Sequence, residues 1–287
     1  MTSEAALENS PAAKPKRSMS RTQKILFFAT GWLIVLMPFL FWWNTWFGRT
    51  LTDQQLNEYL HDTKKPRHIQ QALVQVGERI TKHNAATAQW YPELLRLAAN
   101  PIDEIRNTDA WVMGQDTSGS GFHDALLKML NDSSPMVRGN AALSLIRFGD
   151  ASGRAQIVAL LQPATITATQ SGHIVDSDRP GTAIHQGGLI AKLSTSSGQT
   201  EEIRSPIPGR IRSAAQTGAN VNAGAEMAVV DPSAEQVWEA LRALYLIGQA
   251  DDLPAIRPYE RDLPDISNDV RQQATETERA IRERMQH

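Results

Sequence analysis

The pattern of apolar and glycine positions occurs twice, 37 residues apart, between Ile166 and Val230. The positions and their counterparts are Ile166, Gly172, Ile174, Gly181, Ile184, Gly187, Ile190 and Leu193, then Ile203, Gly209, Ile211, Gly218, Val221, Gly224, Met227 and Val230. Short runs of β-branched residues between glycines are typical of strands joined by tight turns, where glycine adopts positive φ at little cost. The repeat predicts a small all-β domain over 163–231 with two similar halves.

From Thr52 onward, outside this segment, the apolar spacing is helical. Apolar residues three and four positions apart lie on two successive faces, which hold Phe122, Leu126, Leu127 and Leu130, then Val137, Ala141, Leu145 and Phe148. The sequence Asp-Ser-Ser-Pro at 132–135 supplies a turn and an N-cap, and Gly149 ends the second helix. We expect helical repeats over 52–162 and 232–287.

One helical unit is interrupted by the β segment. Residues 155–162 are expected to form a first helix, but no second helix follows directly. The matching second half comes after the β segment, where Asp231, Ala240 and Gly248 reproduce, 99 residues later, the spacing of residues 132, 141 and 149. We therefore expect the β domain to be inserted into one helical hairpin, because repeat proteins accept insertions in their loops.

Residues 25–47 are apolar and carry no charge. As a helix they would reach about 34 Å, enough for the ~30 Å hydrocarbon core of a bilayer. The alternative is a cleaved signal peptide, but its apolar core is shorter and small residues follow it. Basic residues precede the segment (Lys14, Lys16, Arg17, Arg21 and Lys24), so the N-terminus is expected in the cytoplasm and the rest in the bacterial periplasm. Residues 1–24 are expected to be a disordered tail.

Composition and motifs give no sign of catalysis. The chain has 287 residues, a net charge of -2 and no cysteine, so a nucleic-acid partner, a thiolate metal site and a cysteine nucleophile are not expected. His173 and His185 are expected in surface turns, and the other histidines considered (His61, His68, His83 and His123) are scattered over helical segments. Thr117 to Gly121 is expected to be a loop between repeats rather than a phosphate site. No catalytic, cofactor or metal site is predicted, and we expect a protein that is not an enzyme.

The helical segments resemble HEAT repeats. The resemblance rests on Asp132-Ser-Ser-Pro-Met-Val-Arg138, with the alanines and Gly149 that follow, and on similar patterns around 103–114 and 269–274. It implies an α-helical solenoid with two antiparallel helices in each unit. The recurring Arg106, Arg138 and Arg271 could line a basic groove, but we expect each to pair with an Asp of the neighbouring turn.

Residues 164–230 resemble the biotinyl/lipoyl fold and, more loosely, the barrel-sandwich hybrid of periplasmic adaptor proteins. The resemblance rests on 203–211, Ile-Arg-Ser-Pro-Ile-Pro-Gly-Arg-Ile, and on 218–227, Gly-Ala-Asn-Val-Asn-Ala-Gly-Ala-Glu-Met. In carrier members of this family a lysine on the central hairpin takes the cofactor, and here that position falls at Ser197 or Gly198. Lys192 is the only lysine of this segment, and its expected place within a strand makes it a weak candidate for cofactor attachment.

These features together predict a scaffold or adaptor held in the inner membrane by one N-terminal helix, which binds protein partners through both modules. One alternative is a carrier subunit of an envelope enzyme. Another is an accessory subunit of a transport or efflux system, in which ring assembly through the β domain would give homo-oligomers. The long helical hairpin usual in such adaptors is missing, because only Ser194 to Thr200 joins the two halves.

Overall fold

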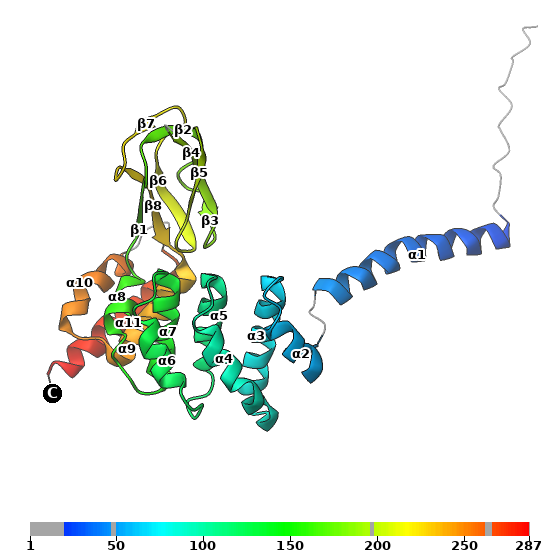
Figure 1. The fold of residues 1–287 in the computed structure, drawn as a ribbon, viewed down its shortest axis with the longest axis horizontal. Helices are drawn as coiled ribbons and strands as arrows, with labels where there is room; N and C mark the ends of the chain where they lie inside the picture. Colours follow the sequence, from blue (N-terminus) through cyan, green and yellow to red (C-terminus); the bar gives the residue numbers. More distant parts are fainter. Residues whose placement is uncertain (1–19, 47–49, 196–197, 262–265, 287) are drawn as a thin grey trace, which may run out of the picture. The chain divides into compact units, whose positions relative to one another are not determined.

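The computed structural model describes residues 20–46, 50–195, 198–261 and 266–286, and the side chains within 40–46 are not described. It contains two compact units, Met1–Thr50 and Leu51–His287, which are treated separately. Of the expected tail, residues 1–19 lie outside the described residues. The coarse architecture is confirmed, since the chain has an N-terminal helix, a helical region and two antiparallel sheets (Figure 1).

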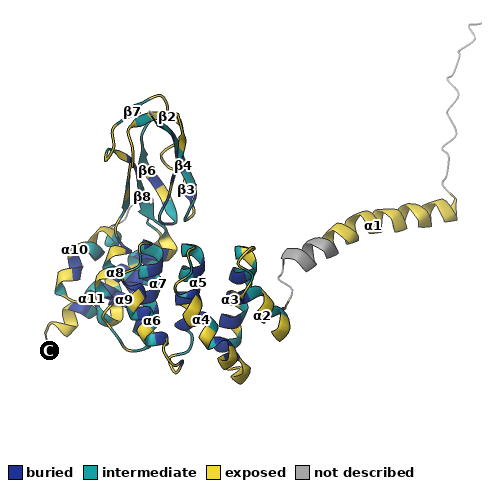
Figure 2. Ribbon diagram, in the orientation of Figure 1, coloured by how far each residue is buried: buried dark blue, intermediate teal, exposed yellow. Residues whose placement is uncertain are grey.

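The first unit contains one long helix, α1 (Arg21–Trp46). It begins at Arg21 rather than at the expected Ile25, because Ser20 and Gln23 cap it reciprocally: the backbone N–H of Gln23 donates to Ser20 Oγ over 3.2 Å, and that of Ser20 donates to Gln23 Oε1 over 3.1 Å. The stretch Arg21–Phe39 is long and apolar enough to cross a membrane, and none of it is buried (Figure 2). By length and composition a signal sequence would satisfy the same test.

The helical region of the second unit consists of short helices that pack in sequence. Its helices are α2 (Asp53–Leu60), α3 (Pro66–Thr81), η1 (Ala85–Trp90), α4 (Tyr91–Leu97), α5 (Asp103–Met113), α6 (Phe122–Met129), α7 (Pro135–Arg147), α8 (Arg154–Ala159), α9 (Ala234–Ile247), η2 (Ala250–Asp252), α10 (Leu253–Ile256), η3 (Arg257–Glu260) and α11 (Asn268–Arg284). Within a pair, α2 contacts α3, α4 contacts α5, α6 contacts α7 and α8 contacts α9. Between pairs, α3, α5, α7, α9 and α11 contact one another in succession.

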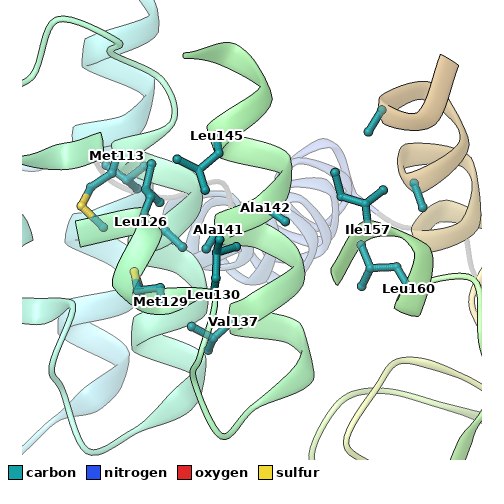
Figure 3. Packing of buried hydrophobic residues seen from close by; sticks show 14 of the residues in the cluster. Met113, Leu126, Met129, Leu130, Val137, Ala141, Ala142, Leu145, Ile157 and Leu160 are labelled. Atoms are coloured by element: carbon teal, nitrogen blue, oxygen red, sulfur yellow. The ribbon is translucent and has the colours of Figure 1, made fainter. Parts of the chain in front are cut away.

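A continuous apolar core joins these helices. Figure 3 shows Val137, Ala141 and Leu145 of α7 among Leu126 and its neighbours from the preceding helix. Each leucine that is fully buried contributes roughly 1.5–3 kcal/mol to folding. On its other side α7 meets α8 closely, since a Cβ at Gly139 would lie 2.5 Å from Leu160 Cδ2. The helical periodicity predicted around residues 122–148 is therefore the periodicity of this core.

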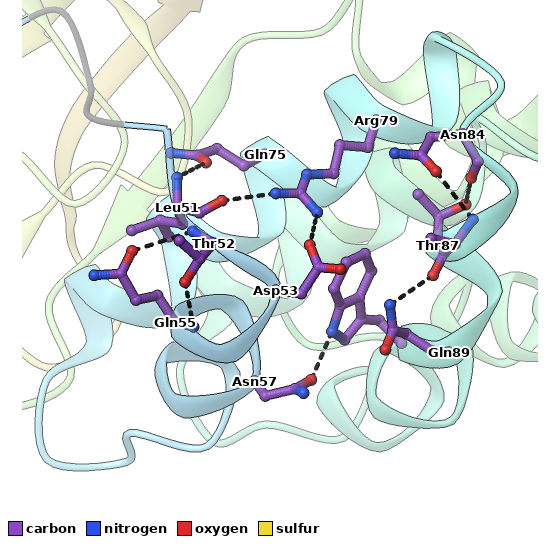
Figure 4. Close-up of polar contacts among 12 residues, drawn as sticks. Leu51, Thr52, Asp53, Gln55, Asn57, Gln75, Arg79, Asn84, Thr87 and Gln89 are labelled. Carbon is purple, nitrogen blue, oxygen red and sulfur yellow. Dashed lines mark hydrogen bonds and ion pairs between the residues drawn. The ribbon is translucent and has the colours of Figure 1, made fainter.

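Polar contacts fix the first helices of this unit (Figure 4). Thr52 caps α2 through a capping box with Gln55, and the Arg79 guanidinium of α3 binds both Asp53 and the carbonyl oxygen of Leu51. Trp90 Nε1 donates to Asn57 Oδ1 over 2.6 Å. Because Asn57 belongs to α2 and Trp90 to η1, these bonds hold three successive elements in place.

Within the described part of 163–231, eight strands form two four-stranded antiparallel sheets. One has the order β1 (Ala164–Thr167), β8 (Glu226–Pro232), β6 (Gly209–Ala214), β3 (Ala183–Ile184), and the other the order β5 (Thr200–Arg204), β4 (Leu189–Thr195), β2 (Gly172–Ser177), β7 (Asn220–Val221). Exchanging β1 with β5, β2 with β6, β3 with β7 and β4 with β8 converts one order into the other. The two halves predicted from the sequence thus have the same topology.

The register of the two sheets also repeats after 37 residues. Ile166 pairs with Ala228 in one sheet, and Ile203 pairs with Ala191 in the other, so each partner is displaced by 37 positions (203 − 166 and 228 − 191). Each of these strand pairs has an irregularity beside the cited residues. The turns match as well: Gly181 has φ of 90° and Gly218 of 91°. Only glycine adopts this conformation without strain, which explains the glycine pattern.

The chain leaves the helical region after α8 and returns at α9, with the β domain between them. The seam left in the helices is closed by direct contacts. Gln236 Nε2 of α9 donates to the carbonyl oxygen of Leu160 over 2.8 Å, and Tyr259 Oη donates to that of Leu161 over 2.6 Å. The β domain has a separate core, against which Met136 of α7 packs.

Candidate interaction surface

A groove runs over the helices that contact one another in succession, and we call it the α7–α9 groove. Its volume is about 590 Å³. Side chains from α5, α7, α9 and α11 line it: Trp111, Asn140, Leu143, Ser144, Ile146, Arg147, Glu235, Glu239, Arg242, Ala243, Tyr245, Leu246, Gln273 and Glu276. A second hollow of about 440 Å³ shares Glu235, Gln273 and Glu276 with it and extends to Trp238 and Asp269. The two hollows form one continuous surface.

Large apolar side chains are exposed along this groove. Trp111 of α5 is 39% exposed, and Tyr245 and Leu246 of α9 are 43% and 60% exposed. On α9 the neighbouring Leu241 and Leu244 are fully buried in the core, so Leu246 points away from the core, and Tyr245 lies at the side of the helix between the two faces. Exposed apolar residues scattered singly are ordinary, but a group of them around one groove is typical of an interaction site.

The rim of the groove is mainly acidic. The carboxylates of the groove are Glu235, Glu239 and Glu276, the second hollow adds Asp269, and the guanidinium groups are Arg147 and Arg242. Arg242 lies over the Trp238 ring, 4.5 Å from its centroid, and 3.5 Å from Glu239. Arg147 donates to Gln115 Oε1 over 2.8 Å. Arg242 and Glu239 therefore form an ion pair, Arg147 keeps its charge beside a neutral amide, and the carboxylates outnumber the arginines by four to two.

A second cleft, of about 490 Å³, lies where the β domain meets the N-terminal ends of α5 and α7. Gln186 Nε2 donates to Asp103 Oδ2 over 3.2 Å across it. A backbone hydrogen bond lowers the pKa of Glu104, but burial and the adjacent Asp103 carboxyl together raise that pKa above its usual value. Ser134 Oγ, at the start of α7, is buried and has no hydrogen-bond partner among the described residues. This cleft lies at the boundary between the helical region and the β domain.

The three recurring arginines have different partners. Arg106 forms the expected pair with the Asp of the next turn, donating from Nε and Nη2 to the two Asp132 carboxylate oxygens over 2.7 Å each. Arg138 binds instead the carbonyl oxygens of residues 132 and 133 in its own turn, and Arg271 binds Asn268. The residue that corresponds to Asp132 at the next turn, Asp231, is bound by Arg212 of the β domain. The expected pairing of an arginine with the Asp of the neighbouring turn is thus present at Arg106. At the next turn, the corresponding Asp231 is bound by an arginine of the β domain instead.

Lys192 lies within β4, as expected from its sequence position. It pairs with Asp176 of β2 on one side and with Glu202 of β5 on the other, and its side chain is half-buried. Gly198, on the hairpin after β4, is exposed and has φ of 79°, whereas Ser197 lies outside the described residues. A lysine fixed in the middle strand of a sheet is poorly placed for a cofactor arm that must swing.

The histidines do not gather. His173 lies in β2 rather than in a turn, and His185 directly follows β3; both are exposed. His61 directly follows α2 and lies beside Glu93, while His68 of α3 and His123 of α6 lie beside Asp62 and Asp150. Within the described ranges no group of three or more His, Asp or Glu could hold a metal ion. Residues 117–121 form the loop between α5 and α6, as expected.

Asp109 of α5 was missed by the sequence analysis. It is fully buried, and neither carboxylate oxygen has a hydrogen-bond partner among the described residues. Burial raises its pKa well above the usual value, while the Glu93 charge adds to this rise and Arg96 opposes it. The available signal was its spacing, since Asp109 follows the buried Ile105 by one helical turn.

Comparisons with known proteins do not identify the chain. No family model matches it, and no curated protein matches its sequence. Among solved structures, it is similar to part of a single-chain, multi-domain long-chain acyl-CoA carboxylase (13% identity, TM-score 0.23), covering 33% of this chain and 10% of that one. It is also similar to an engineered protein of known crystal structure (16% identity, TM-score 0.38), covering 79% and 78%. Scores this low carry no argument about fold or function.

Proposed function

We propose that this protein is a non-enzymatic scaffold or adaptor, anchored in a membrane, that binds protein partners through its helical region and its β domain. The observation that carries the proposal is the α7–α9 groove, where Trp111, Tyr245 and Leu246 are exposed together. Aromatic and large apolar side chains in an open groove favour the binding of another protein, because their burial supplies most of the association energy.

In this proposal the helical region is a HEAT-like solenoid and the β domain is a lipoyl-like barrel-sandwich hybrid inserted into it. The successive contacts of α3, α5, α7, α9 and α11 support the first assignment. The exchange relation between the two sheets supports the second. Helical repeats offer an extended surface for partners, and neither fold by itself implies a catalytic centre.

The anchor assignment rests on the apolar run of α1, which begins at Ile25 and follows the basic residues at 14–24. We expect the N-terminus in the cytoplasm and residues 50–287 in the periplasm. The natural chain has no cysteine, so single cysteines give a clean test. An impermeant maleimide should label Ala86→Cys, which is at an exposed position, and should not label Ser10→Cys in spheroplasts. Labelling of Ser10→Cys alone would indicate the opposite orientation in the membrane.

Purification from mild detergents tests the binding function itself. The full-length protein should copurify with a reproducible set of envelope proteins. The double variant Trp111→Ala with Leu246→Ala should reduce the recovery of these partners. Val74→Ala is the matched control, since Val74 of α3 is 43% exposed in the helical region and does not line the groove. Recovery of the protein alone in every mild detergent would contradict the proposal.

A further inference from the structure

We infer that the α7–α9 groove receives a basic, amphipathic helical segment of a partner protein. This inference rests on the proposed scaffold function and adds the chemistry of the partner. It follows from three properties of the groove: its apolar wall, the sign of its rim charge and the backbone that borders it.

The apolar wall requires apolar anchors on the partner. Trp111 on one side and Tyr245 and Leu246 on the other are contributed by α5 and α9, with the partly buried Leu143 and Ile146 of α7 between them. The groove therefore offers contacts from three successive helices. An amphipathic helix can fill such a groove with apolar side chains at positions i, i+3, i+4 and i+7.

The rim charge selects a basic partner. The groove and the adjoining hollow together carry four carboxylates and two arginines; Arg242 pairs with Glu239, and Arg147 binds the neutral amide of Gln115, so Glu235, Asp269 and Glu276 leave a net negative charge. Complementary charge at a rim speeds association and rejects partners of the same sign. Lysine or arginine on the polar face of the incoming helix would meet this surplus of carboxylates. The same surplus disfavours nucleic acid and anionic lipid headgroups.

The backbone around the groove favours a helix over an extended strand. All four bordering elements are α-helices, whose internal N–H and C=O groups are bonded within the helix. Strand addition needs a free sheet edge, and these helices offer none. Side-chain packing is then the main available mode of binding.

Photo-cross-linking in native membranes tests the inference with the full-length protein. Benzoylphenylalanine is placed at Trp111, at Leu246 and, as a reporter on the β domain, at Val175. The adducts are digested and their peptides sequenced by mass spectrometry. We expect the adducts at Trp111 and Leu246 to contain a segment of another protein with Lys or Arg and apolar residues at helical spacing. An acidic segment, lipid, a second copy of this chain, or no adduct at these two positions would overturn the inference.

Charge variants sharpen the test. Neutralising the rim with Glu235→Gln and Glu276→Gln should lower the cross-linking yield at Leu246 by about tenfold, as expected for lost rim complementarity. The control, Glu58→Gln with Glu283→Gln, removes the same charge from exposed positions outside the groove and should leave the yield unchanged. Equal yields for both pairs would overturn the inference. Protein adducts at Val175 without adducts in the groove would refute the inference while leaving the scaffold function standing, whereas a protein that yields no adduct and no complex would refute both.

Discussion

The β domain and the helical region solve the problem of burying apolar surface in opposite ways. In the β domain each half covers the other: Ile174 and Leu193 of one half and Ile211 and Val230 of the other are all essentially buried. In the helical region each pair covers the next, and the face of α5, α7 and α9 keeps Trp111, Tyr245 and Leu246 exposed. A domain closed by its own internal symmetry leaves little apolar surface for partners, whereas an open series of helices leaves a groove.

The largest expected effect comes from breaking the closed domain. At Gly209 an added Cβ would lie 1.7 Å from the carbonyl oxygen of Asp231, which is backbone and cannot move aside cheaply. Gly209→Ala should destabilise the β domain by about 3 kcal/mol or more. Hydrogen exchange should show lost protection in the strands while the helices from α2 to α7 keep theirs. Loss of protection throughout would mean that the two regions fold as one unit.

The next largest effect concerns the ion pair between Arg106 of α5 and Asp132 in the turn before α7. Arg106 and Asp132 are each 11% exposed and form a bidentate pair, so Arg106→Ala should cost about 2–3 kcal/mol in urea unfolding. Burial favours the neutral form of Asp132, but the hydrogen bonds from Arg106 and Ser134 N–H and the Arg106 charge together outweigh it and hold the pKa of Asp132 below the usual value. The stabilisation is therefore present above the ordinary aspartate pKa and is lost as the pH falls through the depressed one.

Arg138→Ala is the matched control for this pair, because Arg138 binds only carbonyl oxygens of its own turn among the described residues. It should cost about 1 kcal/mol, and the cost should not depend on pH between 3 and 7. An equal loss of unfolding free energy in the two variants would contradict a stabilising ion pair between Arg106 and Asp132.

Asp109 should make the helical region, unlike the β domain, less stable as the pH rises. Its pKa is raised in the folded protein, so the neutral carboxyl is favoured, and stability is lost as the pH increases from the ordinary aspartate pKa through the raised one. Asp109→Asn should remove this dependence and add about 1–3 kcal/mol at neutral pH. Urea unfolding at several pH values measures it. Asp124→Asn, at an exposed site, should change little, and an unchanged pH profile for Asp109→Asn would be the contrary result.

The smallest expected effect is at Lys192. Because this lysine is fixed between Asp176 and Glu202 in the middle of a sheet, the intact mass of the purified protein should show no lipoyl or biotinyl addition. Lys192→Arg should preserve both the fold and the recovered complex. An added cofactor mass that disappears in Lys192→Arg would establish the carrier alternative instead.

How much could be predicted differs between the two regions for a physical reason. In the β domain the turns at Gly181 and Gly218 have positive φ, a conformation that only glycine adopts easily. The positions of the glycines in the sequence therefore indicate where the strands end. The helical segments were also expected, because Leu126, Ala141 and Leu145 follow the 3.6-residue period of a buried face. The start of α1 at Arg21 was not predicted, since Ser20 and Gln23 cap the helix before the apolar run at 25–47 begins.

The groove was not predictable in the same way. Trp111 and Tyr245 come from helices on either side of the inserted domain, and their proximity depends on how α9 packs against α7. The burial of Asp109 was not predicted, because it depends on the helices that cover this residue and not on its neighbours in sequence. Contacts between distant segments leave no local pattern.

The seam between α8 and α9 has a consequence for the architecture. Ala164, at the start of β1, is the strand partner of Val230, near the end of β8, so the two ends of the β domain are roughly 5 Å apart. Gln236 and Tyr259 bind directly to the residues that follow α8, so the inserted domain does not have to bridge a longer distance between the helices. We expect that another small module with adjacent termini could replace the β domain at this position. Of the contacts with the helices, those at Met136 and Asp103 would then have to be replaced or lost.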